Sequence, residues 1–275
     1  RAGALDRIGP NRATLMAALP QALKMADQDA KNRDAGMSDL FGFDSEALQE
    51  SPTAYEVVPE WEEDIRLAGE KETLGLYLTG HPINRFLPEL STFTSCRIAD
   101  LSEGKAKTVT IAGLIIGIRT RPTKKGDKIA FVTIDDRSGR IDVNFFTKEY
   151  ARFHELLGKD RIIVCSGEIR HDDYAGGLVM GVQEAYDMER AREVYAKYLH
   201  LKLPQQQALN GFVSELDRVL APFREGGTPI LLDYHNEQGK ARVMLGEQWR
   251  VRPSDELLSR LRKLLGEEQV ALKYR

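Results

Sequence analysis

The chain has 275 residues, of which 42% are hydrophobic and 29% are charged, and its formal net charge is −3. This length and composition are typical of two or three globular domains. No segment approaches the roughly 18 uninterrupted apolar residues that a membrane helix needs, and no basic and apolar leader opens the sequence.

The two cysteines, Cys96 and Cys165, are too few for a disulfide framework and too isolated for a zinc site. We interpret both as small, reduced hydrophobic residues of a cytoplasmic protein. Because the first residue is Arg1 rather than Met, we expect a piece of a longer or processed protein without a secretory signal.

Residues 1–35 form the first predicted segment, which is helical. Leu15, Leu19 and Leu23 recur every four residues, which is the spacing of one face of a helix. Pro20 lacks a backbone N–H, so we expect it to kink this helix or to divide it.

Residues 36–59 show no sustained hydrophobic period and are predicted to be a linker. Ten acids and no base occur between Asp34 and Asp64, so this segment is strongly acidic. Within it, Leu40 and Phe41 are an isolated apolar pair, and short apolar anchors are how linkers dock into partner pockets. The alternative is that this pair folds back on its own domain. The candidate docking motif is Met37, Ser38, Asp39, Leu40 and Phe41.

Residues 60–105 are predicted to be a helical connector. A helix begins near Trp61, continues through Ile65, Ala68 and Glu72, and ends at the helix-breaking segment 80–82. A short connecting stretch then continues to about residue 105.

Residues 106–190 change to a period of two with many β-branched residues, which predicts strands. A helix is predicted at 148–157, after the third strand. Three strands, a helix and two further strands are the connectivity of an OB-fold, a five-stranded β-barrel that commonly binds oligonucleotides. The predicted strands are 109–118, 129–135, 141–146, 161–170 and 177–186.

The loop predicted between the first two strands is basic, and phenylalanines lie in the strands that follow it. On an OB-fold, cations follow the phosphates of a single strand and aromatic rings stack on its bases. The alternative is that alternate phenylalanines point into the barrel and that the lysines are only solvated. One of Phe145 and Phe146 should face outward in a regular strand. The candidate contacts with single-stranded DNA are Arg119, Arg121, Lys124, Lys125, Lys128, Phe131, Phe145 and Phe146.

Residues 191–275 are predicted to form a two-layer α/β sandwich of βαββαβ order. Ser254 is the expected N-cap of the second helix, and Gly266 its expected end. Leu257, Leu261 and Leu264 recur on one face of that helix and should pack in the core. Strands are expected at 200–203, 229–234, 241–245 and 270–274, and helices at 210–220 and 253–265. The overall fold class is therefore multidomain α+β.

We expect no catalytic site, metal or cofactor in this chain. The acid pairs Asp135/Asp136 and Asp172/Asp173 lie in predicted turns, where Asp is common, and Asp27/Asp29 lie on different faces of a helix. The five histidines show no metal-ligand spacing. A phosphoryl-transfer enzyme is the alternative, and it requires metal-dependent turnover by this chain.

Three motifs resemble one family of proteins. Residues 72–82 read ETLGLYLTGHP, residues 135–140 read DDRSGR, and residues 246–255 read GEQWRVRPSD. These strings resemble the C-terminal third of bacterial replicative DNA polymerase III α subunits, and the resemblance covers essentially the whole chain. It implies that the longer protein is a DNA-directed DNA polymerase, a nucleotidyltransferase, whose catalytic regions lie upstream. The segment 1–35 is then the tail of a helix-hairpin-helix region.

The resemblance also implies three partners. The pentapeptide Met37–Phe41 resembles a sliding-clamp binding motif of the form Gln-x-x-Leu/Met-Phe, with Met37 in place of the usual Gln. The OB-fold and its basic loop are implicated in binding single-stranded template. The terminal domain docks the τ subunit of the clamp loader. The alternative function is a free-standing RNA-binding OB module of the anticodon-recognising kind.

The τ-docking surface must lie outside the leucine face of the last helix, because those leucines should be core. It can come from the basic side of that helix, from the last strand or from Trp249, and the alternative for Trp249 is that it caps the small core. The candidates are Trp249, Arg260, Arg262, Lys263, Val270, Leu272 and Tyr274.

Overall fold

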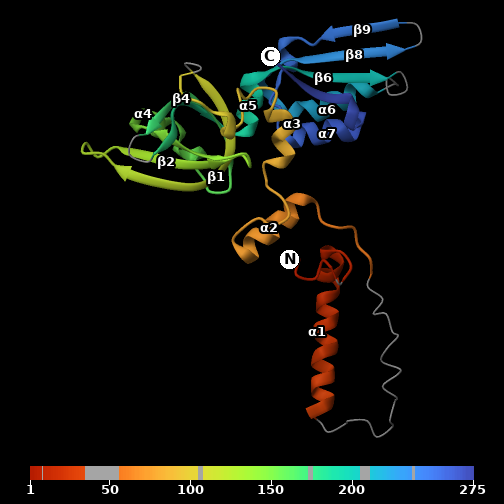
Figure 1. Cartoon of the computed structure of the whole chain (residues 1–275). Helices are drawn as coiled ribbons and strands as arrows, with labels where there is room; N and C mark the ends of the chain where they lie inside the picture. Colours follow the sequence, from red (N-terminus) through yellow and green to blue (C-terminus); the bar gives the residue numbers. More distant parts are fainter. Residues whose placement is uncertain (8, 35–55, 105–107, 173–175, 205–210, 237–238) are drawn as a thin grey trace. The chain divides into compact units, whose positions relative to one another are not determined.

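A computed structural model describes residues 1–7, 9–34, 56–104, 108–172, 176–204, 211–236 and 239–275. The chain divides into two compact units, Arg1–Asn84 and Arg85–Arg275 (Figure 1). Among the described residues, no helix is long and apolar enough to cross a membrane.

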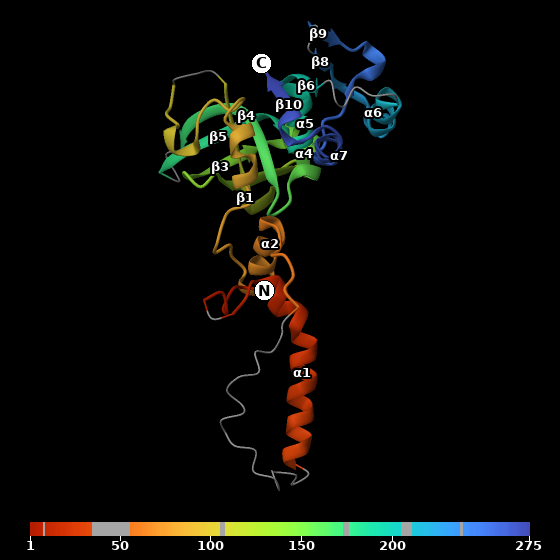
Figure 2. The ribbon, with the colours of Figure 1, turned by 90° about the vertical axis from the view of Figure 1, so that its right-hand side faces the viewer.

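The first unit contains two helices, α1 (Arg12–Asp34) and α2 (Glu63–Leu74). Pro20 lies inside α1, which continues as one helix (Figure 2). Of the two expected effects of Pro20, a kink or a division, the division is therefore wrong. Good helix formers on both sides of Pro20 continue the helix. The second helix ends earlier than predicted, because Gly75 adopts the left-handed conformation at φ 76° and its N–H bonds to the Lys71 carbonyl.

The second unit begins with the short helix α3 (Leu87–Leu90) and continues into a closed barrel of order β1-β2-β3-β5-β4. This order confirms the predicted OB-fold. Alternate residues of each strand, such as Val132 and Val143, point inward and are fully buried. The barrel elements are β1 (Val109–Pro122), β2 (Lys128–Asp135), β3 (Arg140–Phe145), α4 (Thr147–Phe153), β4 (Ile162–Asp172) and β5 (Gly177–Tyr186).

The first barrel strand is longer than predicted. Pairing between β1 and β2 continues beyond residue 118, through Arg121 opposite Ile129 and Pro122 opposite Lys128. The connection is a tight turn in which Thr123 N–H bonds to the Asp127 carbonyl. Arg119 and Arg121 are therefore held on a strand, and not on the loop where the sequence pattern placed them.

The C-terminal elements form a four-stranded sheet of order β10-β6-β8-β9, with α6 and α7 on one face (Figure 1). Ser254 caps α7 by accepting a hydrogen bond from Leu257 N–H, as predicted, and Gly266 follows its end. The predicted two-layer sandwich is confirmed, with one added short strand, β7. The elements are α5 (Met188–Tyr195), β6 (Ala196–Pro204), α6 (Phe212–Leu220), β7 (Arg224–Thr228), β8 (Ile230–Asn236), β9 (Gly239–Met244), α7 (Asp255–Leu265) and β10 (Val270–Tyr274).

Single-turn 3₁₀ helices connect several of these elements. They are Asn84–Phe86, Ile98–Asp100, His154–Leu156, Ala221–Phe223, Glu247–Trp249 and Glu267–Gln269.

Candidate nucleic-acid interface

The outer surface of the barrel contains a cavity of about 230 Å³, which we call the barrel groove. Residues from all five strands line it, because neighbouring strands present outward positions to the same face. The lining residues are Arg119, Arg121, Phe131, Asp142, Asn144, Asp172 and Val179.

The strand register brings three chemically different side chains and a glycine into one row across this groove. Arg119 pairs with Phe131, Phe131 with Asn144, and Asn144 with Gly181. A guanidinium group, an aromatic ring and an amide therefore lie side by side, next to a position without a side chain. These are the groups that contact phosphates, stack on bases and bond to base edges.

Acidic and aromatic neighbours orient the two arginines. Asp142 Oδ2 lies 2.9 Å from Arg119 Nη2, and Thr133 Oγ1 donates to the other carboxylate oxygen at 2.5 Å. The side chain of Arg119 is nevertheless 66% exposed. The guanidinium of Arg121 lies 5.9 Å from the centre of the Phe131 ring, which is cation–π range. Both guanidinium groups are thus held at the groove and remain accessible to an anion.

The amide of Asn144 is a further feature of the groove. Its side-chain oxygen is buried and has no hydrogen-bond partner among the described residues. A buried acceptor without a donor is costly, so a ligand that offers an N–H group would be favoured here. Asn144 was not among the DNA contacts predicted from the sequence.

Two family models match the chain. The model described as an OB-fold nucleic acid binding domain matches residues 109–195. The model described as the C-terminal domain of DNA polymerase III subunit alpha matches residues 215–266.

Curated relatives match the chain from end to end. DNA polymerase III subunit alpha of Vibrio cholerae serotype O1 is 43% identical over 274 residues, which are 99% of this chain and 24% of that protein. The Escherichia coli K12 protein of the same name gives the same identity and coverage. This chain is a relative of the C-terminal region of DNA polymerase III α subunits. It spans about a quarter of the length of those relatives.

Among solved structures, the second single-stranded DNA binding protein (SSBb) of Mycobacterium smegmatis is similar to 31% of this chain and to 90% of its own chain. The sequence identity is 15% and the TM-score is 0.29.

The predicted DNA contacts of this polymerase III α relative separate into three groups. Arg119, Arg121 and Phe131 line the groove. Exposed Lys124 and Lys125 lie in the turn between β1 and β2, and exposed Lys128 begins β2. The phenylalanines that follow β2 make up the third group.

Only one of the two adjacent phenylalanines faces outward. Phe146 is 47% exposed but does not line the groove. Phe145 is 0% exposed and packs in the barrel core. The prediction that Phe145 contacts bases is therefore wrong, because Phe145 occupies an inward position of β3, as do Ile141 and Val143.

The predicted τ-docking residues differ in how far they are exposed to solvent. Val270 is 4% exposed and belongs to the core of the C-terminal sheet, so its prediction as a docking residue is wrong. Leu272 and Trp249 are half-buried against the same core, and the guanidinium of Arg224 lies 4.3 Å from the Trp249 ring. Tyr274 is half-buried, and its hydroxyl bonds to Glu89.

The basic side of α7 is more accessible than the last strand. Arg260 and Lys263 are exposed, and Arg262 is half-buried. Each arginine has an acidic neighbour, Glu256 for Arg260 and Glu267 for Arg262. The clamp-motif residues Met37, Ser38, Asp39, Leu40 and Phe41 lie outside the described residues.

Proposed function

We propose that this chain is the C-terminal part of a replicative DNA-directed DNA polymerase of the polymerase III α type, and that its barrel binds single-stranded template DNA. The observation that carries this proposal is the 43% identity over 99% of the chain to polymerase III α subunits. Because that match runs through every segment, it disfavours a free-standing RNA-binding module. We assign catalysis to parts of the longer protein outside this chain.

The barrel groove supplies the chemistry for single-strand binding. In this proposal, Arg119 and Arg121 neutralise phosphates and Phe131 stacks on a base. Such contacts tolerate any sequence, because every base has a π-face and every nucleotide a phosphate. This tolerance is what a protein that follows a changing template requires.

Replacing Phe131 with Leu should raise the Kd for an oligothymidylate about tenfold, since base stacking on an aromatic side chain contributes roughly 1–3 kcal/mol. Fluorescence anisotropy of a labelled oligonucleotide measures this change. Phe146→Leu is the matched control: it removes an exposed ring that does not line the groove, and its Kd should stay at the wild-type value. Equal losses in both variants would refute the placement of DNA in the groove.

We propose that Met37–Phe41 binds the sliding clamp, as its resemblance to the clamp motif implies. Replacing Leu40 and Phe41 with Ala should abolish clamp binding, since apolar anchors at interface hot spots often contribute more than ~2 kcal/mol each. Met37→Gln should tighten binding through added hydrogen bonds. Surface plasmon resonance with immobilised clamp tests both changes, and Ser38→Ala is the control. Normal clamp binding by the double-alanine variant would show that Met37–Phe41 is not the clamp-binding motif.

We propose that the basic side of α7 docks the τ subunit. Deleting the last strand is a poor test, because Val270 is core and the sheet would lose an edge. Lys263→Glu instead changes an exposed charge and should weaken τ binding about tenfold in a pull-down titration, since like-charge juxtaposition costs more than 1 kcal/mol. Lys197→Glu, an exposed lysine of β6, is the control. Unchanged affinity of the Lys263 variant would place τ elsewhere.

A further inference from the structure

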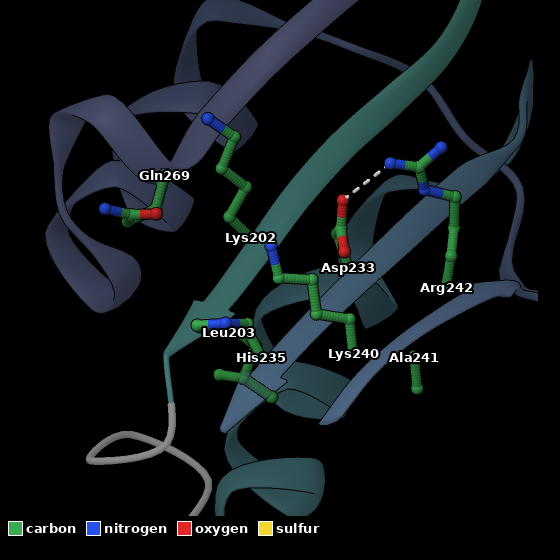
Figure 3. A pocket seen from close by; sticks show the side chains of 8 residues that line it. All are labelled: Lys202, Leu203, Asp233, His235, Lys240, Ala241, Arg242 and Gln269. Atoms are coloured by element: carbon green, nitrogen blue, oxygen red, sulfur yellow. Dashed lines mark hydrogen bonds and ion pairs between the residues drawn. The ribbon is translucent and has the colours of Figure 1, made fainter. Parts of the chain in front are cut away.

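The C-terminal sheet has one covered face and one open face. Alternate residues of β6 and β8, such as Leu199, Leu201 and Ile230, pack against α6 and α7. Residues between them point to the other side. There the register places Lys202 opposite Asp233, and Asp233 opposite Arg242. Figure 3 shows these side chains on three neighbouring strands.

A cavity of about 530 Å³ lies on this open face, and we call it the sheet cavity. Three cationic side chains, one histidine and one carboxylate line it, together with few apolar groups. The lining residues are Lys202, Leu203, Asp233, His235, Lys240, Ala241, Arg242 and Gln269.

The only acid among these lining residues is already engaged. Asp233 Oδ2 lies 3.1 Å from Arg242 Nη2 and 3.4 Å from His200 Nε2. The hydrogen bond from Arg242 holds the pKa of Asp233 below its usual range. Within the described part of the chain, neither Lys202 nor Lys240 has a carboxylate within ion-pair distance. Two ammonium groups thus face the cavity without an acidic partner there.

The sheet cavity and the barrel groove differ in charge. Two arginines of the barrel groove face two acids, Asp142 and Asp172. In the sheet cavity, two lysines and an arginine face one acid. Since phosphate binding depends on uncompensated cations, the sheet cavity is the more favourable site for phosphates.

We propose that the sheet cavity binds the phosphodiester backbone of a single-stranded nucleic acid, as a second site beyond the barrel groove. Neighbouring strands are about 4.8 Å apart. Lys202 of β6 and Arg242 of β9 are separated by one strand, so their backbone positions are about 10 Å apart. Their long side chains span the phosphates of adjacent nucleotides.

An acidic protein segment is less well matched to this surface. Lysine is depleted in protein–protein interfaces, where aromatic and other large anchors dominate. Of the residues that line the sheet cavity, Leu203 and Ala241 are the apolar ones, and neither is a large aromatic anchor. Lysine and arginine are, in contrast, the usual partners of nucleic-acid phosphates.

The test compares the full chain with its Lys202→Gln/Lys240→Gln variant in binding a long oligothymidylate at several salt concentrations. The slope of log K against log salt should fall by about 1.4 in magnitude, since each single-strand phosphate contact contributes about 0.7. Lys24→Gln/Lys31→Gln changes the net charge equally at exposed positions of α1 outside the cavity and should leave the slope unchanged. An unchanged slope in the cavity variant overturns the proposal.

Lysine acetylation footprinting separates this site from the barrel groove. Oligothymidylate should slow the acetylation of Lys202 and Lys240 but not that of exposed Lys24. The same protection is expected in the Phe131→Leu variant. If the groove binds no DNA, this protection should persist, so failure of the barrel proposal is distinguishable from failure of this one. Protection by polyglutamate and none by oligothymidylate would overturn the proposal and identify an acidic protein as the ligand.

Discussion

Replacing Arg192 with Met should lower the free energy of unfolding of the unit Arg85–Arg275 by roughly 3–5 kcal/mol, because removing one partner of a buried ion pair leaves the other without compensation. Arg192 is 3% exposed. Its Nε and Nη2 lie 2.7 and 2.9 Å from the two oxygens of Glu89. Its Nη1 lies 2.6 Å from Asp255 Oδ1.

This network joins elements that are far apart in sequence. Glu89 belongs to α3, Arg192 to α5 and Asp255 to the start of α7. The Tyr274 hydroxyl of β10 also bonds to Glu89, and the ring of Tyr195 stacks on Phe93 at 4.9 Å. Burial alone would lower the pKa of Arg192, but Glu89 and Asp255 more than offset this and raise the pKa above its usual range.

Urea unfolding followed by Trp249 fluorescence, in a Trp61→Phe background, measures the effect of Arg192→Met. Arg190→Met is the matched control from the same helix, because the Arg190 side chain is 63% exposed and its partner Glu193, which is 9% exposed, also has Arg252 at 3.6 Å. Since Glu193 keeps a cationic partner and the Arg190 side chain is solvated, the control should shift the midpoint little. Equal shifts in the two variants would contradict the assigned role of Arg192.

Replacing Glu70 with Gln should destabilise the unit Arg1–Asn84 by roughly 3 kcal/mol, since it removes the buried partner of the Arg12 ion pair and leaves Arg12 with Asp6, whose side chain is 41% exposed. Glu70 is 0% exposed. It accepts hydrogen bonds from Leu78 N–H at 2.7 Å, from Thr79 N–H at 3.0 Å and from Arg12 Nη1 at 2.9 Å. One carboxylate thus connects α2, the start of α1 and the segment that follows Gly75.

The same carboxylate makes the stability of this unit depend on pH. Burial raises the pKa of Glu70, but the hydrogen bonds from Thr79, Arg12 and Leu78 outweigh burial and hold the pKa at about 2, below the ordinary 4.5. A pKa that is lower in the folded state stabilises fully above the unfolded value. The contribution of Glu70 should therefore be complete above about pH 4.5 and be lost as the pH falls toward about 2.

Urea titrations followed by Trp61 fluorescence, in a Trp249→Phe background, test the predicted destabilisation and its dependence on pH. The difference in stability between wild type and Glu70→Gln should shrink as the solution is acidified. Glu72→Gln is the control, because the Glu72 side chain is 66% exposed and pairs with Arg1 at the surface. A difference that is independent of pH would disprove the assigned role of the Glu70 charge.

The sequence by itself determined the elements whose signals are local. The period of two predicted a strand at 141–146, which is β3, and Ser254 and Gly266 predicted the ends of α7. The order of these elements was sufficient for the OB-fold and for the two-layer sandwich. Local patterns carry this information because strand alternation and helix capping depend on residues close together in the chain.

Only the tertiary structure decided which outward residues meet. The row of Arg119, Phe131 and Asn144 depends on the register of three strands, and register is a property of pairing between strands. The length of β1 likewise depended on its pairing with β2. The contacts of Arg192 with Glu89 and Asp255 span 103 and 63 residues. No periodicity in the sequence signals such contacts, because folding alone brings these groups together.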